Sequence, residues 1–146
     1  MPNIDVITSK LSAMSSYMEE LSPYLDQVKL GRITVVSPEM HIIARLFQLI
    51  IDAAIDINTH IITRGNLESP DDYEGTFPIL GKNGIIPNEL AFKISKSVGL
   101  RNKLVHGYEK VDKGKVLSDI TNDIGQYKAY MKHITDFMDK HERKLN

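Results

Sequence analysis

The chain has 146 residues, enough for one well-packed domain and too few for two of ordinary size, so residues 1–146 are expected to form a single domain. A hydrophobic fraction of 42% and a charged fraction of 25% argue against a disordered or membrane-embedded chain, and the absence of cysteine excludes disulfides and thiolate sites. A formal net charge of −1 argues against a protein that coats nucleic acid through its overall charge.

The first predicted element is a helix that begins near the N-terminus. Pro23 should kink this helix or restart it with Ser22 as the cap, because proline removes a backbone donor and clashes with the preceding turn. Gly31 is expected to end the segment. The apolar residues recur at alternating spacings of three and four, the mark of a single apolar stripe: Ile4, Ile7, Leu11, Met14, Met18, Leu21, Leu25 and Val28.

A second helix is predicted from Ser37 to about Thr63. Its start signal combines Ser37 as the N-cap, Pro38 in the first turn and the acidic Glu39 beside the positive end of the helix dipole. Gly65 follows its end. The apolar stripe is wide, so this should be the most buried helix, at the centre of a bundle: Ile42, Ile43, Leu46, Phe47, Leu49, Ile50, Ala54, Ile57, Ile61 and Ile62.

The remainder of the chain predicts a loop and two more long helices. Turn-forming residues are dense in residues 66–87, which favours a loop with one short helix. A third major helix should start near Pro87, and residues 112–115 should form a turn before the last helix. That helix shows a three-four seam of Leu117, Ile120, Ile124, Tyr127, Met131, Ile134 and Met138. The expected fold is therefore all-α, an up-and-down bundle of four to five helices.

The distribution of apolar residues also bears on the location of the protein. Residues 1–10 lack the unbroken apolar stretch of a secretory signal. The longest apolar region, residues 46–62, is interrupted by polar and charged side chains, so it cannot span a membrane. A cytoplasmic location with no membrane partner is expected.

Basic side chains are concentrated between Asn88 and Lys115. This stretch holds seven basic residues against three acidic ones, a local charge of +4. A polyanion is expected to bind here, and Lys96 and Lys103 are the residues assigned to RNA contacts. By charge alone, a solvated helix face with ordinary surface lysines would be the simpler interpretation.

Four chemically useful side chains lie within eight residues at the end of the third helix. Arg101 is a permanently charged phosphate binder, and it should be long enough to reach toward the imidazole of His106. Asn102 and His106 are four apart, so on an unbroken helix the amide could orient the imidazole. Gly107 is expected to end the helix and to turn the phenol of Tyr108 outward, where another protein can reach it.

These residue types suit the metal-free cleavage of RNA by its own ribose 2′-hydroxyl, without a cofactor. Histidine transfers protons because its unperturbed pKa lies near neutral pH, and arginine binds two phosphate oxygens with one planar fork. A single histidine falls short of the usual acid and base pair, so a twofold homodimer with facing motifs is expected. Arg101 and His106 are then the catalytic residues, with Asn102 in support.

The segment from Arg101 to Tyr108 matches an Arg-x4-His-x-Tyr signature and thereby resembles the HepT-like family of HEPN ribonuclease toxins. Residues 98–105 and 48–58 are also similar to that family, so the resemblance spans most of the chain from about Pro38 onward. Gly107 departs from it, because the family often has an acidic residue there. The resemblance implies a toxin that acts on RNA and not on DNA. It also implies an MNT-type minimal nucleotidyltransferase antitoxin, which silences the toxin by adding AMP units to Tyr108.

Other interpretations remain open at this point. The chain could be a catalytically inactive HEPN module that recruits or docks a nucleotidyltransferase, which the near-neutral net charge mildly favours, or a plain structural protein. Asp56 and His60, four apart on the central helix, could share a metal ion, although no third ligand is evident nearby. A polar stripe explains Asp52 and Asp56 more simply, and these aspartates could line the dimer cleft and hold Arg101.

Overall fold

The computed structural model describes residues 2–145, with the side chains of residues 2–141, and every regular element in this part of the chain is a helix. The elements are α1 (Ile4–Lys29), α2 (Glu39–Arg64), α3 (Thr76–Lys82), α4 (Asn88–Ser95), α5 (Ser97–His106), a 3-10 turn (Tyr108–Lys110) and α6 (Lys113–Leu145). The predicted third helix is present as α4 and α5, which only Lys96 separates. The predicted all-α bundle is therefore confirmed.

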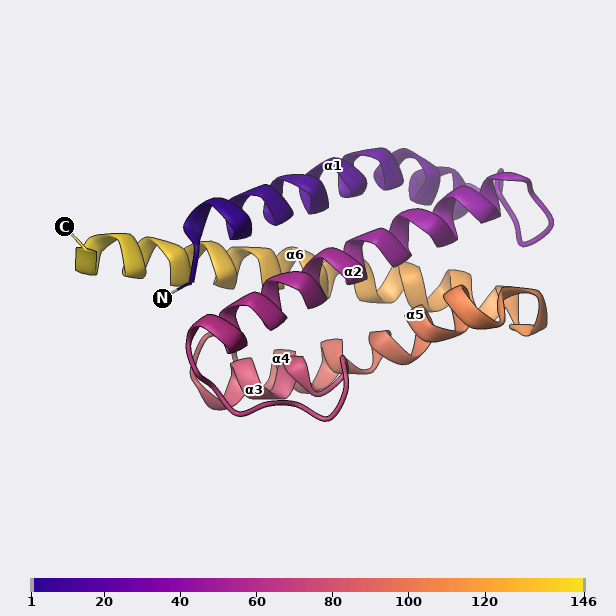
Figure 1. Ribbon diagram of the computed structural model, residues 1–146. Coiled ribbons are helices and arrows are strands. Elements are labelled where there is room, and N and C mark those ends of the chain that lie inside the picture. The colour runs from indigo at the N-terminus through magenta and orange to yellow at the C-terminus, as the bar shows by residue number, and fades with distance from the viewer. Residues whose placement is uncertain (1, 146) are drawn as a thin grey trace.

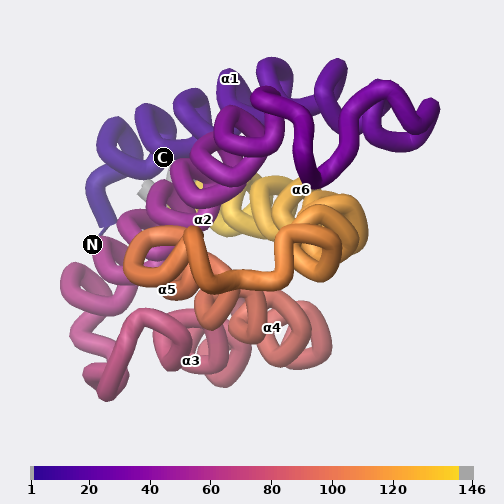
Figure 2. Tube along the Cα trace, turned by 90° about the vertical axis from the view of Figure 1, so that its right-hand side faces the viewer, coloured from indigo at the N-terminus to yellow at the C-terminus, as the bar shows by residue number. Residues whose placement is uncertain are grey.

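The helices run up and down in turn. Figure 1 shows α2 antiparallel to α1, then α3, α4 and α5 leading back along α2, and α6 returning across the bundle. In Figure 2, α2 has α1 on one side and the α3–α5 segment on the other. The helix α2 also contributes the largest share of the buried core, so its predicted central position is confirmed. None of the helices within residues 2–145 is both long and apolar enough to cross a membrane.

The helix α1 continues through Pro23 and does not restart at Ser22, so that part of the prediction is wrong. Its neighbours Leu21 and Leu25 are buried, and burial of such side chains contributes about 1.5–3 kcal/mol each, which offsets the hydrogen bond that proline removes. Gly31 follows the helix with a φ of +74°, a left-handed conformation that favours glycine. The predicted end of the first helix is confirmed.

Two predictions about helix starts are wrong. Ser37 does not cap α2, because its hydroxyl accepts a hydrogen bond from the backbone N–H of Thr34 at 2.9 Å, within a tight turn. The predicted turn at residues 112–115 is the beginning of α6. Asp112 stabilises this start by accepting a hydrogen bond from the N–H of Lys115 at 3.2 Å.

Buried polar contacts join four helices beneath the candidate site. Asn58 on α2 is fully buried, and its amide donates to the hydroxyl of Thr76 on α3 at 3.1 Å. The Tyr130 hydroxyl on α6 donates to the Asn58 side-chain oxygen at 2.5 Å. At the start of α5, Tyr127 contacts Ser97 through their hydroxyls. Because buried polar groups are costly when unpaired, these bonds select one arrangement of α2, α3, α5 and α6.

Candidate active site

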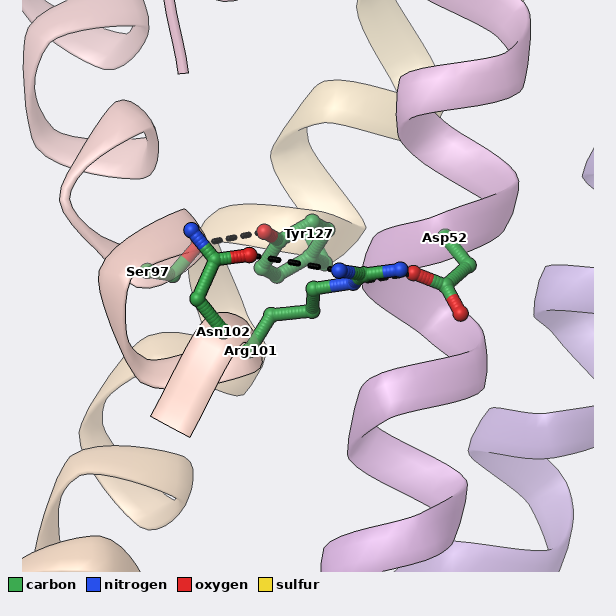
Figure 3. Close-up of polar contacts among 5 residues, drawn as sticks. All are labelled: Asp52, Ser97, Arg101, Asn102 and Tyr127. Carbon is green, nitrogen blue, oxygen red and sulfur yellow. Dashed lines mark hydrogen bonds and ion pairs between the residues drawn. The ribbon is translucent and has the colours of Figure 1, made fainter. Parts of the chain in front are cut away.

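Arg101 lies on the side of α5 that faces α2. Its Nε donates to the carboxylate of Asp52 at 2.6 Å, and the two side chains are 19% and 31% exposed. A second guanidinium nitrogen, Nη1, donates to the amide oxygen of Asn102 at 3.2 Å. Figure 3 shows the guanidinium between these two acceptors, with α5 and α2 contributing one side each. The sequence analysis suggested that Asp52 could hold Arg101, and this contact agrees with that role. The carboxylate thereby keeps a partly exposed cation at the surface.

Arg101 and Asp52 line an open cleft of about 360 Å³ between α2, α5 and the segment that leads to α3. Asp56 lies in the same cleft and pairs with Lys10 at 2.9 Å. The remaining lining side chains are Ile55, Thr59 and Tyr73. The cleft therefore offers one cation held by a carboxylate, an aromatic ring and room for a nucleotide-sized group.

His106 is the last residue of α5, and its side chain is exposed. No hydrogen bond joins it to Asn102 within the described residues, since that amide contacts Arg101 instead. At ~100° per residue, five positions along a helix correspond to a turn of ~140° around its axis. Arg101 and His106 therefore start from different faces of α5, and within the described residues the hydrogen bonds of the arginine go to Asp52 and Asn102.

Tyr108 follows Gly107 in the 3-10 turn, and its ring is turned inward. The ring lies 5.4 Å from that of His41 on α2, between ring centres, and Lys113 Nζ lies 5.3 Å from its centre. The Tyr108 hydroxyl is buried without a hydrogen-bond partner, and burial raises its pKa. A small pocket at this position is also lined by Arg45. The predicted outward turn of Tyr108 is wrong because its ring packs against the first turns of α2, where His41, Ala44 and Arg45 lie.

The buried Tyr108 hydroxyl gives a stability prediction. A buried polar group without a partner costs about 1–3 kcal/mol, so Tyr108→Phe should raise the free energy of unfolding by about 1 kcal/mol in urea denaturation. Tyr130→Phe is the matched control, because the single proton of that hydroxyl is satisfied by the Asn58 side-chain oxygen at 2.5 Å, with the Ala54 carbonyl oxygen at 3.1 Å, and the loss of the hydroxyl should destabilise the protein. A loss of stability in Tyr108→Phe would show that its hydroxyl is satisfied in solution.

A basic groove of about 540 Å³ lies between α5, the 3-10 turn and α6. Lys96 and Lys103, the residues predicted to bind RNA, both line it. Lys110 and Lys115 line it as well, and the charge excess in residues 88–115 was the only sequence signal for their involvement. The acidic side chains on its wall are Asp112 and Asp119, so the groove carries an excess of two positive charges.

Asp123 lies one turn beyond Asp119 on α6 and gives a prediction about pH. Burial first, and then the negative charge of Asp119, raise the pKa of Asp123 to about 6. A carboxyl group with a higher pKa in the folded chain binds its proton preferentially there. The resulting stability is present below about pH 4 and is lost as the pH rises through about 6. Over this window we expect the free energy of unfolding of the wild type to fall relative to that of Asp123→Asn, measured by urea denaturation. Parallel pH profiles for the two proteins would contradict this.

Most of this chain matches a known protein family. Residues 14–134 match the family model described as ribonuclease HepT-like. The chain belongs to the HepT-like ribonuclease family. Membership makes the protein an endoribonuclease, as the sequence resemblance indicated.

Several relatives of this HepT-like protein have been described. A tRNA nuclease HepT from Aphanizomenon flos-aquae is 35% identical over 142 residues, which cover 94% of this chain and 95% of the relative. An mRNA nuclease HepT from Shewanella oneidensis is 29% identical over 80 residues, which cover 55% and 60%. The solved structure of a tri-AMPylated HEPN toxin from Shewanella oneidensis in complex with an MNT antitoxin has a TM-score of 0.77 at 22% identity, over 92% of this chain and 99% of that one. At this identity the structural likeness establishes the fold.

Asp56 and His60 on α2, which were considered as a pair of metal ligands, make other contacts. Asp56 binds Lys10, and Nε2 of His60 accepts a hydrogen bond from the backbone N–H of Asn3 at 2.8 Å. Among residues 2–141, no three His, Cys, Asp or Glu side chains gather where they could hold a metal ion. These two side chains act structurally, by tying the start of α1 to α2.

Proposed function

We propose that this HepT-like chain is the toxin of a toxin–antitoxin pair and cleaves RNA without a metal ion, at a cleft between two copies of the chain. One observation carries the proposal: Arg101 is held by Asp52 at the mouth of a cleft, while His106 is exposed on another face of the same short helix. A phosphate-binding cation and a proton-transfer group are thus both presented to solvent.

The reaction follows from these two groups. A base removes the proton of the ribose 2′-hydroxyl, and the 2′ oxygen forms a bond to phosphorus. The bond from phosphorus to the 5′ oxygen breaks, and an acid protonates that oxygen. Arg101 stabilises the charge on the phosphate oxygens, and Asp52 acts as a positioning residue because its carboxylate fixes the guanidinium.

Two copies of the chain would supply both the base and the acid that the cleavage step needs. One histidine cannot act as base and acid in the same step, and in a single chain the Arg101 guanidinium is held by Asp52. A twofold axis beside α5 would bring His106 of each copy to one scissile phosphate. The basic groove, to which α5 contributes Lys103, would hold the RNA backbone.

Silencing by AMP addition is the second part of the proposal. The Shewanella oneidensis structure contains an AMPylated toxin with its MNT antitoxin, which supports an antitoxin of the same type here. We assign the modification to Tyr108, two residues after His106. An AMP group there adds negative charge and bulk beside the RNA site. Because the hydroxyl is buried, the 3-10 turn must leave α2 before modification.

Cleavage of bulk RNA in excess EDTA tests the proposed reaction. Unmodified wild-type protein should cut under these conditions, and Arg101→Ala should not, because it loses the phosphate contact. Lys132→Ala is the control, because it removes an exposed cation of α6 that lines neither the cleft nor the basic groove, and it should keep most of the activity. Cleavage that requires an added metal ion would overturn the mechanism. No cleavage with or without metal would favour a binding module that docks a nucleotidyltransferase.

A further inference from the structure

Tyr73 is an exposed aromatic residue beside Arg101. It lies in the segment between α2 and α3, and 56% of it is exposed. It lines the cleft that contains Arg101 and Asp52, and also an adjoining cavity of about 410 Å³. The ring therefore lies where the two spaces meet, next to the phosphate-binding side chain.

The backbone of Tyr73 is held firmly although its side chain is exposed. Its carbonyl oxygen accepts hydrogen bonds from the backbone N–H of Thr76 at 3.2 Å and from the Thr76 hydroxyl at 2.6 Å. The same hydroxyl accepts from the buried Asn58, which in turn bonds Tyr130. The polar network of the core thus anchors the segment that carries the ring. An aromatic ring on a fixed backbone loses little conformational freedom when a ligand stacks on it.

The charges around Tyr73 distinguish between parts of an RNA molecule. In the cleft, Asp52 and Asp56 are each paired with a cation, Arg101 and Lys10, whereas the adjoining cavity contains Asp71 and Asp72, which make no ion pair within the described residues. The cavity side of Tyr73 therefore repels phosphate, whereas Arg101 on the cleft side and the lysines of the basic groove attract it. Carboxylates accept hydrogen bonds from the amino groups of nucleobases, and an aromatic ring stacks on their faces. The site therefore suits a base and not a backbone.

We propose that Tyr73 is the stacking platform for one nucleobase of single-stranded RNA, adjacent to the phosphate that Arg101 binds. The inference rests on the proposed ribonuclease function and adds a base subsite to it. Tyr73 is a specificity residue with no part in proton transfer. Its loss should raise KM for a short single-stranded RNA and change the sites of cleavage, with a smaller effect on kcat.

Binding to a non-cleaving protein tests this directly. In the His106→Ala background, a short single-stranded RNA with 2-aminopurine at one position after another is titrated, and both affinity and base fluorescence are measured. Tyr73→Ala should weaken binding about 5- to 150-fold, the range for loss of one base–aromatic stack, and should abolish the fluorescence change at one position. Tyr73→Phe should retain both signals, whereas Tyr73→Leu, an apolar side chain without a ring, should lose them.

An abasic site provides the matched control. When the base at the responsive position is removed, Tyr73→Ala and its parent should bind the RNA equally, because no base remains to stack on the ring. Equal affinity of Tyr73→Ala and its parent for intact RNA would overturn the inference while leaving the ribonuclease proposal intact. If Tyr73→Ala instead lost only its binding to the antitoxin and still bound RNA normally, the ring would be a protein-docking residue. That result would also overturn the inference. Absence of any RNA binding by the wild type would overturn both proposals.

Discussion

Replacing His106 with alanine is expected to lower the rate of RNA cleavage by roughly 10²- to 10⁴-fold, the usual contribution of a group that transfers a proton in the transition state. The fold should be unaffected, because the side chain is exposed at the end of α5 and makes no hydrogen bond within the described residues. Single-turnover cleavage of a labelled RNA measures the rate, and urea denaturation confirms equal stability. His133→Ala on α6 is the matched control and should cleave at the wild-type rate.

Mixed dimers show whether the site is shared between two copies. A dimer of one tagged wild-type chain and one His106→Ala chain should cleave nearly as slowly as the double mutant dimer, because the acid and the base then come from different copies. If each copy held a complete site, the mixed dimer would retain about half of the wild-type rate, a result that follows from independent sites. That outcome would contradict the shared site while leaving the role of His106 untouched.

Complete modification of Tyr108 with AMP should reduce cleavage to the background level. Co-expression of the chain with its MNT-type nucleotidyltransferase antitoxin, followed by mass spectrometry, should place the added mass on the peptide that contains Tyr108. Tyr108→Phe should keep its cleavage activity and escape silencing, because the ring still packs on His41 while the acceptor oxygen is gone. Silencing of Tyr108→Phe by the same partner would rule out this residue as the site.

The buried position of Tyr108 adds an expectation about the rate of this modification. The hydroxyl must leave its pocket first, so AMP transfer should be faster in His41→Ala, which removes the ring packed against Tyr108. Hydrogen exchange of the amides in residues 107–111 reports the same opening. Tyr24 on α1 serves as an internal control, since its peptide should stay unmodified. Equal rates of transfer in the wild type and His41→Ala would show that His41 does not restrain the turn.

The long helices could be predicted from the sequence because each buries one continuous stripe, and burial dominates the energy of such elements. Local signals were less reliable. Ser37 had a nearer backbone partner in Thr34, and Asp112 began a helix where a turn was expected. Pro23 sits inside α1 because its neighbours are buried on the core. In each case contacts outside the local pattern decided the outcome.

The motif residues could be selected from the sequence, but the side chains that contact them could be predicted only in part. Spacing along one helix predicted that Asn102 could orient His106, yet the Asn102 amide contacts Arg101, and the guanidinium is held by Asp52 from another helix. The same limitation explains the inward position of Tyr108, since the ring packs against α2. The exposure of Tyr73 could not be inferred at all, because it depends on how the segment before α3 is anchored to the core.

The exposure of His106 outside the core has a genetic consequence. A chain that loses this imidazole keeps every core contact, so it accumulates as a folded protein and is not removed by proteolysis. With a site shared between copies, such a chain still pairs with active ones and disables them. A missense allele at this position would therefore act as a dominant negative, whereas an allele that disrupts the core would be recessive.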